Sequence, residues 1–327
     1  MSSTPNPAHP IHVPVMLEEV VDALPIPDGG VAIDLTIGLG GHAQALLSNA
    51  GAGARYLGID RDSDALNIAK QRLGNDDRLS ILQSTYEEVW DTEEYRQWAA
   101  KCAPDGADAI LADLGASSLQ LKTPERGFSF MHEGPLDMRM DAGKGPTALE
   151  WLRAQDEKSL AGALYEYGEE RASRPIASAI LSALGNGSLS TTLDLANAVY
   201  RVLPKEVAQR KKQIDPATRT FQAIRIAVNS ELNGLGRTIE RAAMTLKAKG
   251  RIGVISFHSL EDRIVKQTFR RLSGVYSGPG RMPATELPKI LHLISPHGIR
   301  PSEAEQAANP PSRSARLRLA QRVLCTN

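Results

Sequence analysis

A glycine-rich turn between an apolar run and a helical pattern constrains the fold of this chain more than any other feature. The apolar residues 31–33 lead into Asp34, and residues 42–48 after the turn show apolar residues at helical spacing. The glycines between them are Gly38, Gly40 and Gly41. Glycine lets the backbone approach a ligand that a Cβ atom would keep away. This order of strand, glycine turn and helix predicts a ligand site at the carboxyl end of a parallel sheet.

A second acid, Asp60, ends the next apolar run and indicates which ligand is bound. A carboxylate there can accept hydrogen bonds from both hydroxyls of a ribose, which predicts an adenosine-containing cofactor. The turn also fits the dinucleotide pattern, with Ala43 in third place. However, Asp34 would repel a pyrophosphate and would attract a sulfonium or an α-ammonium group. The acid before the glycines therefore favours S-adenosylmethionine over a nicotinamide cofactor and resembles motif I of class I methyltransferases.

Length and composition set the class of protein. The chain has 327 residues, 42% of them hydrophobic and 23% charged, which is typical of a soluble protein with one large domain or two modest ones. No apolar run approaches the roughly 18 residues of a membrane span, and residues 1–10 lack the pattern of a signal peptide. We expect a cytoplasmic protein without a membrane partner and with a disordered tail at residues 1–10. Cys102 and Cys325 show no metal-ligand spacing, and we expect no metal.

Strand and helix patterns alternate in both halves of the chain, which predicts an α/β fold with a parallel, doubly wound sheet. The predicted strands are residues 31–35, 55–59, 79–83, 107–114 and 251–257, and residues 290–294 and 317–323 form a hairpin-like pair. The predicted helices around them are residues 13–24, 42–48, 63–73, 87–100, 217–232 and 238–249. Gly250 is expected to end the last of these helices, and Ser259 to cap the next one.

Helical patterns without strands replace this alternation in the middle of the chain. Residues 123–145 have no clean period but are too apolar for disorder, which predicts an ordered loop. Thr147 and Glu150 form a capping box, and Thr191 begins a further helix. We therefore expect an inserted all-α domain at residues 125–215. The methyltransferase domain is expected to consist of residues 11–124 and 216–327.

Asp113 ends the fourth predicted strand, where class I methyltransferases hold their substrate. An exocyclic amine of a base is a poor nucleophile because its lone pair is delocalised into the ring. An acceptor for the amino hydrogens helps the nitrogen to become pyramidal, so Asp113 is a candidate catalytic residue, although it can instead hold the cofactor. His258 follows a strand and precedes a helix. It is a second catalytic candidate, or it simply forms a structural hydrogen bond.

Long motifs between residues 12 and 321 resemble the ribosomal RNA small subunit methyltransferase H family, also called MraW. They are residues 12–17, 40–42, 59–62, 113–118, 125–130, 134–141, 167–171, 216–223 and 256–263. The resemblance implies methylation of the N(4) amino group of one cytidine in the decoding region of 16S ribosomal RNA, with S-adenosylmethionine as donor. It implies cofactor contacts by Gly40, Gly41, His42, Asp60, Tyr86, Asp113 and Gln120. Leu119 stands where the family often has proline, and Tyr86 where it often has phenylalanine.

Basic residues cluster locally although 38 basic and 38 acidic residues balance over the chain. The candidate RNA contacts are Arg210, Lys211, Lys212 and Arg219. Such clusters are also typical of ordinary solvated surfaces. The predicted partner is 16S ribosomal RNA or the small ribosomal subunit, and the inserted domain is expected to face it. The oligomeric state is left open, with a homodimer as one alternative.

Two other functions are weighed against an RNA methyltransferase. A nicotinamide-dependent oxidoreductase is disfavoured by Asp34 and by the lack of a hydride-handling motif. A non-catalytic RNA-binding assembly factor would have no need of two cofactor carboxylates, Asp34 and Asp60. Binding of S-adenosylmethionine or of NAD separates these alternatives.

Overall fold

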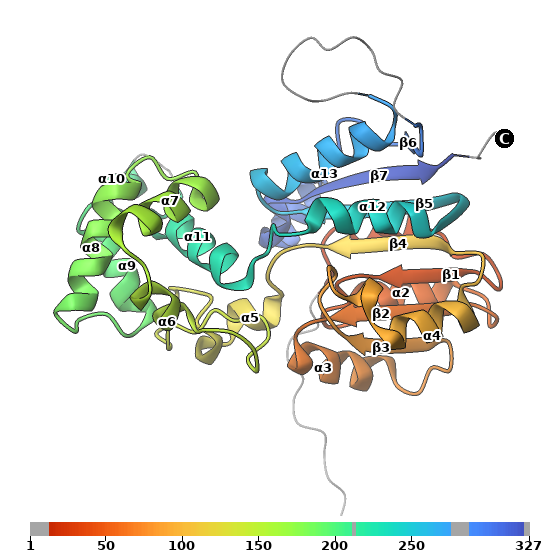
Figure 1. Cartoon of the computed structure of the whole chain (residues 1–327), viewed down its shortest axis with the longest axis horizontal. Coiled ribbons are helices and arrows are strands. Elements are labelled where there is room, and N and C mark those ends of the chain that lie inside the picture. Colours follow the sequence, from red (N-terminus) through yellow and green to blue (C-terminus); the bar gives the residue numbers. More distant parts are fainter. Residues whose placement is uncertain (1–12, 211–213, 276–287, 324–327) are drawn as a thin grey trace, which may run out of the picture. The chain divides into compact units, whose positions relative to one another are not determined.

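The computed structural model describes residues 13–210, 214–275 and 288–323. The chain divides into two compact units, Met1–Gly115 with Gly234–Asn327, and Ala116–Asn233. We call the first the α/β unit and the second the helical unit (Figure 1). The predicted tail at residues 1–10 and two predicted RNA contacts, Lys211 and Lys212, lie outside the described residues. No helix in the described part is long and apolar enough to cross a membrane.

The described strands of the α/β unit form one seven-stranded sheet in the order β3-β2-β1-β4-β5-β7-β6 (Figure 1). Strands β1 to β5 pair in parallel, whereas β7 is antiparallel to both β5 and β6. The strands are β1 (Val31–Asp34), β2 (Arg55–Asp60), β3 (Leu79–Gln83), β4 (Ala107–Asp113), β5 (Leu246–Ser256), β6 (Leu291–Leu293) and β7 (Arg316–Arg322). The predicted doubly wound α/β fold and the hairpin-like pairing of the last two strands are confirmed.

Helices cover both faces of this sheet because its central strands are apolar on both sides, as is usual for parallel sheets. Ile33 and Ile110 face a core shared with α4, α12 and α13. Ala32 and Leu111 face the opposite core, shared with α1, α2 and α3. The helices are α1 (Leu17–Ala23), α2 (Gly41–Asn49), α3 (Ser63–Leu73), α4 (Glu93–Cys102), α12 (Leu235–Thr245), α13 (Ser259–Leu272) and α14 (Glu303–Ala308). The α/β unit therefore has three layers, with the sheet in the middle.

Two predicted boundaries in this unit are wrong. The helix expected at residues 238–249 ends at Thr245, and β5 begins at Leu246, so that Gly250 lies inside a strand. Leu246 pairs with Ala107 ahead of an irregularity in the ladder, and this sheet pairing outweighs the local helical pattern. The helix α13 is capped by His258, one residue before the predicted cap.

Seven helices make up the described part of the helical unit, around an apolar core of its own. They are α5 (Ser118–Lys122), α6 (Ala148–Arg153), α7 (Glu157–Gly168), α8 (Ser173–Gly185), α9 (Thr192–Tyr200), α10 (Lys205–Arg210) and α11 (Ala217–Asn229). The capping boxes at Thr147 and Thr191 are both formed. Phe221 of α11 belongs to this core, so α11 packs within the helical unit although the sequence analysis placed it after the insertion.

The loop that precedes α6 is ordered by buried side chains, as predicted. Leu136 and Met138 are 2% and 0% exposed, and both pack into the core of the helical unit. Asn229 holds the loop from α11, because its amide accepts the N–H of Met140 and donates to the carbonyl of Met138, each over 2.7 Å. A loop with so many tertiary contacts needs no secondary structure to be fixed.

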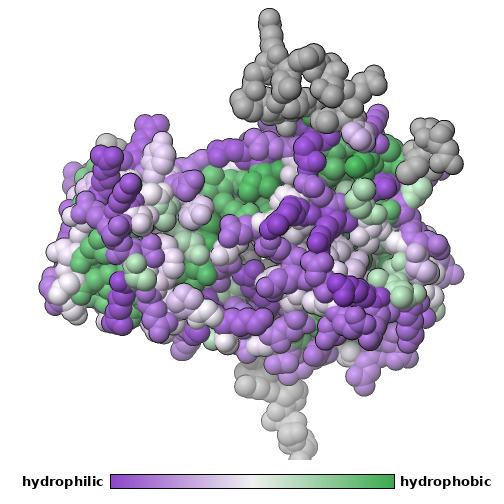
Figure 2. Space-filling model, viewed as in Figure 1, coloured by the Kyte–Doolittle hydropathy of each residue, from purple (hydrophilic) through white to green (hydrophobic). Residues whose placement is uncertain are grey.

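The visible surface is largely hydrophilic, with interspersed hydrophobic patches (Figure 2). In the helical unit, Val207 and Ile214 are 45% and 60% exposed. Isolated exposed apolar residues are normal on soluble proteins. These two also line a pocket, which is described below.

Candidate active site

The topology of the sheet places three acidic residues at the point where ligands bind in doubly wound folds. The chain runs outward from β1 through β2 to β3, and then returns to the other side of β1 with β4. Ligands bind beyond the carboxyl ends of the strands at this reversal. Asp34, Asp60 and Asp113 are the last residues of β1, β2 and β4. The acids singled out from the sequence are therefore brought to one edge of the sheet.

The glycine turn joins β1 to α2 and is tied to β2. Gly38 and Gly40 have positive φ angles of 52° and 78°, which favour glycine. The N–H of Gly38 donates to Asp60 Oδ2 over 2.9 Å. Gly40 caps α2, and a Cβ atom at Gly41 would collide with the ring of Pro14. Each glycine of the turn is thus required by backbone conformation or by close packing.

Asp60 keeps acceptor capacity toward a ligand although two backbone groups hold it. Its Oδ2 bonds Gly38, and its Oδ1 accepts the N–H of Asp62 over 2.9 Å. A carboxylate offers about four lone-pair positions, so two positions stay available for hydroxyl donors. Burial raises the pKa of Asp60, while these two hydrogen bonds act in the opposite direction. The geometry suits the predicted contact with a ribose.

Asp34 is buried, and each of its carboxylate oxygens accepts a hydrogen bond from a protein group. It is 1% exposed, its Oδ1 accepts the N–H of Thr36 over 3.1 Å, and its Oδ2 accepts the hydroxyl of Tyr56 over 3.0 Å. Burial raises the pKa of Asp34 to about 7, against the effect of both hydrogen bonds and with the help of the charge of Asp60. We therefore expect Asp34 to act on a ligand through its charge and through the backbone it holds, and its cofactor role stays a prediction.

Asp113 carries an oxygen that has no hydrogen-bond partner among the described residues. Its backbone N–H donates to Thr36 Oγ1 over 2.6 Å, which fixes the end of β4 against the segment after β1. Its Oδ1 is buried and unpartnered, and its Oδ2 lies 3.8 Å from His42 Nδ1. Burial, together with the charges of Asp34 and Glu261, raises the pKa of Asp113 well above its usual range. A donor or a cation from a ligand would satisfy this group.

His42 connects the start of α2 to the N-terminal segment. Its Nε2 lies 3.0 Å from the carbonyl oxygen of Val15 and, because a carbonyl only accepts, donates to it. Its Nδ1 faces Asp113. His42 is buried, so its described contacts are structural, and the predicted cofactor contact remains a prediction.

Tyr86 and Gln120 complete the predicted cofactor set, each in its own unit. The Tyr86 ring packs against the core of the α/β unit, and its carbonyl accepts Trp90 Nε1 over 2.8 Å. Gln120 belongs to the helical unit and is 3% exposed. Its side-chain oxygen accepts the N–H of Ser117, which forms a capping box at the start of α5. Leucine at position 119 has therefore not prevented an ordered turn before Gln120.

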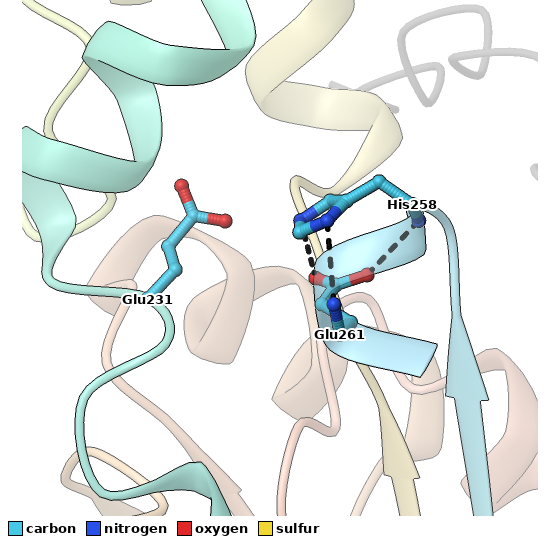
Figure 3. Close-up of side chains that lie close together, drawn as sticks. All are labelled: Glu231, His258 and Glu261. Atoms are coloured by element: carbon cyan, nitrogen blue, oxygen red, sulfur yellow. Dashed lines mark hydrogen bonds and ion pairs between the residues drawn. The ribbon is translucent and has the colours of Figure 1, made fainter. Parts of the chain in front are cut away.

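His258 is held by the first turn of the helix that it caps. Its Nδ1 accepts the N–H of Glu261 over 3.4 Å, and its Nε2 lies 3.2 Å from Glu261 Oε1 (Figure 3). Glu261 Oε2 in turn accepts the N–H groups of Phe257 and His258. Figure 3 also draws Glu231, a residue of the helical unit that pairs with Arg225 there. These contacts explain His258 structurally, and its catalytic role stays a prediction.

The two described candidate RNA contacts lie on two successive helices of the helical unit. Arg210 ends α10, and Arg219 is exposed in the first turns of α11. Arg219 lines a pocket of about 510 Å³ whose walls are mainly apolar. The other lining residues are Glu170, Leu203, Pro204, Val207, Ala208, Ile214, Asp215 and Pro216. The charged lining residues are thus one arginine and two acids, Glu170 and Asp215, and the contact of Arg219 with RNA stays a prediction.

Three residues of the candidate site were missed by the sequence analysis: Thr36, Tyr56 and Glu261. Thr36 lies between Asp34 and Gly38, which the sequence analysis did select, so its position in the motif could have identified it. Tyr56 lies near the start of β2 and reaches Asp34 only because the strands pair in register, with Tyr56 opposite Ala32. Glu261 follows His258 at the spacing of a capping box, which the sequence alone displays.

Comparisons with known proteins agree on one family. The sequence pattern of the MraW methylase family matches residues 9–323. A protein of Hydrogenovibrio crunogenus named ribosomal RNA small subunit methyltransferase H is 46% identical and covers 95% of this chain and 96% of its own length. Its namesake in Acinetobacter baylyi is 45% identical, over 96% of this chain and 99% of its own length.

A solved structure of an rRNA methylase from Streptococcus thermophilus is 9% identical, with a TM-score of 0.37 over 94% of each chain. A score this low shows neither a shared fold nor a shared activity. In contrast, the family pattern and the two named relatives match nearly the whole sequence, and they confirm the predicted family. The prediction of an S-adenosylmethionine-dependent methyltransferase agrees with this family. This chain belongs to the MraW methylase family.

Proposed function

We propose that this protein transfers a methyl group from S-adenosylmethionine to the N(4) amino group of a cytidine in the decoding region of 16S ribosomal RNA. The observation that carries the proposal is the cluster of Asp34, Asp60 and Asp113 at the carboxyl ends of three neighbouring strands. Asp60 holds the ribose of the donor, and the charge of the cluster attracts its sulfonium. The names of the relatives support ribosomal RNA as the substrate.

Asp113 is the residue that suits an amine as the methyl acceptor. An exocyclic amine has to lose one proton when its nitrogen forms a bond to the methyl carbon. The unpartnered Oδ1 of Asp113 accepts a hydrogen bond from the amine, and its raised pKa lets the carboxylate take up the proton. The methyl group is already activated by the donor, so the protein contributes mainly the alignment of the two reactants.

The helical unit supplies contacts to the RNA in this proposal. Arg219 at the rim of the pocket, together with Arg210, binds phosphate, while the apolar walls accept an unstacked base. A cytidine in a stable duplex is a poor substrate because its amino group is paired, so the target base has to leave its stack before methylation. Lys211 and Lys212, which lie outside the described residues, are proposed as further contacts to phosphate on the basis of the sequence.

The decisive experiment is methylation of purified small ribosomal subunits that lack this modification, followed by digestion and mass analysis of nucleosides. We expect N(4)-methylcytidine at one position, and no product with Asp113→Ala. Asp105→Ala changes an exposed acid before β4 and serves as the control. Methylation of the ring carbon or of the ribose, or full activity of Asp113→Ala, would exclude the proposed chemistry.

A further inference from the structure

Tyr56 is the side chain that holds the most deeply buried acid of the site. It is fully buried on β2, and its hydroxyl donates to Asp34 Oδ2 over 3.0 Å. The N–H of Thr36 supplies the second donor, to Asp34 Oδ1. Both carboxylate oxygens thus have a donor, so the side chain of Asp34 is fixed in one orientation. Two donors facing one carboxyl group favour its ionised form.

The surroundings of Asp34 otherwise oppose a negative charge. Strand β2 contributes Asp60, strand β4 contributes Asp113, and these acids and Asp34 repel one another. The charged or titratable groups beyond them are His42 of α2, Glu261 of α13, Asp62 and Arg61, which act on Asp113 or Asp60. No Lys or Arg of the described residues forms an ion pair with Asp34. Its ionised form therefore depends on two hydrogen bonds.

We propose that Tyr56 is a positioning residue for the methyl donor, because its buried hydroxyl keeps Asp34 oriented and ionised where its charge attracts the sulfonium. This inference rests on the proposed function, since it assumes S-adenosylmethionine as the ligand. Asp34 is 1% exposed, so we expect it to act on the donor mainly through its charge, and charges interact more strongly in a protein interior than in water.

Because the pKa of Asp34 lies near neutral pH, its charge, and with it the attraction of a cation, changes with pH in this range. Burial raises this pKa to about 7, and the Tyr56 hydroxyl lowers it relative to a site without that donor. The neutral and the ionised form of Asp34 therefore exchange within the neutral pH range in the protein without ligand. Removal of the hydroxyl shifts this balance toward the neutral acid, and a neutral Asp34 no longer attracts a cation.

The methyl donor and its product separate this electrostatic role from a structural one. S-adenosylmethionine has a positively charged sulfur, whereas S-adenosylhomocysteine has a neutral sulfur and is otherwise the same apart from the methyl group. A change that acts through the charge of Asp34 must affect the donor more than the product. A change that merely loosens the site affects both ligands.

The test is calorimetric binding of both ligands to Tyr56→Phe between pH 6.5 and pH 9. Loss of one hydrogen bond to a charged group raises the proton affinity of Asp34 about tenfold. Near neutral pH the ionised fraction then falls by up to about tenfold, and affinity for the donor falls with it. We expect affinity for the product to change less than about twofold, and donor affinity to recover toward pH 9.

Two further variants complete the design. Tyr95→Phe removes a hydroxyl from another largely buried tyrosine, on α4, and is expected to leave both affinities unchanged. Asp34→Asn removes the charge itself, so Tyr56→Phe is expected to have no additional effect on donor selectivity in that background.

Equal losses of donor and product affinity at every pH would overturn the inference, as would an unchanged donor affinity in Tyr56→Phe. Should Tyr56→Phe fail to fold, the ratio of donor to product affinity in the unaltered protein is measured instead. We expect this ratio to fall as the pH drops from 8 to 6, and a constant ratio would overturn the inference. Failure of the unaltered protein to bind S-adenosylmethionine at any pH would instead refute the proposed function.

Discussion

Asp60→Ala should weaken binding of the cofactor at least tenfold while the α/β unit stays folded. In the proposed complex the carboxylate accepts hydrogen bonds from two ribose hydroxyls, and hydrogen bonds to charged groups contribute about 1.5–3 kcal/mol each. One such bond lost without replacement corresponds to about a tenfold change in affinity. Water can replace part of the second bond, so a tenfold loss is the minimum that we expect.

The same substitution has two opposing effects on the stability of the protein without ligand. It removes the acceptor of the Gly38 and Asp62 N–H groups, at a cost of about 1–3 kcal/mol for each group left without a partner. It also removes a carboxylate whose pKa is raised by burial, and this loss of a disfavoured charge is stabilising. The net destabilisation should therefore stay below the sum of the two hydrogen bonds.

Calorimetry with S-adenosylhomocysteine and thermal denaturation without ligand measure the two effects separately. Asp60→Asn keeps the volume and one acceptor oxygen, and should fall between the unaltered protein and Asp60→Ala in affinity. The exposed Asp105→Ala is again the control. An affinity of folded Asp60→Ala within twofold of the unaltered protein would remove Asp60 from the cofactor site.

Two further predictions concern stability. Arg225→Ala should destabilise the helical unit by about 3–5 kcal/mol in denaturant unfolding. The guanidinium of Arg225 donates to both carboxylate oxygens of the nearly buried Glu231, each over 2.9 Å, and the substitution removes this pair. A loss below about 1 kcal/mol would contradict the prediction. Without ligand, the free energy of unfolding should fall as the pH rises from about 4 to 7. Burial raises the pKa of Asp34 in the folded state to about 7. In this pH range the folded state therefore holds a proton that the unfolded state has released. The contribution is at most roughly 4 kcal/mol; an equally steep decline of melting temperature in Asp34→Asn would refute it.

The sequence predicted the parts of the fold that local signals determine. Residues 63–73 and 79–83 were predicted with the same bounds that the structure shows for α3 and β3. The signals for α3 are local, because Asp62 caps the helix by accepting the N–H of Asp64, and Gly74 ends it with a φ of 63°. The boundary at Leu246 was missed because the pairing with Ala107 is a contact between distant parts of the sequence. Helical spacing alone carries no information about such a partner.

The candidate site shows the same division between local and distant contacts. Asp34, Asp60 and Asp113 were found because each ends an apolar run, a pattern that is visible in the sequence. The contact of Tyr56 with Asp34 depends on the register of two strands and on a long side chain, so no local pattern marks it. The same is true of the interaction of His42 with the carbonyl of Val15.

The crowding of acids at one edge of the sheet is costly for the protein alone and useful once a cation is bound. The charges of Asp34 and Asp60 oppose each other, and those of Asp34 and Glu261 act against ionisation of Asp113. Under the proposed function, the positive sulfonium of the donor relieves this repulsion, and we expect this relief to contribute to the binding free energy of the donor. The product lacks the charge on sulfur and cannot relieve it to the same extent. We therefore expect this arrangement to favour binding of the methyl donor over its product, which would help the product to leave after each methyl transfer.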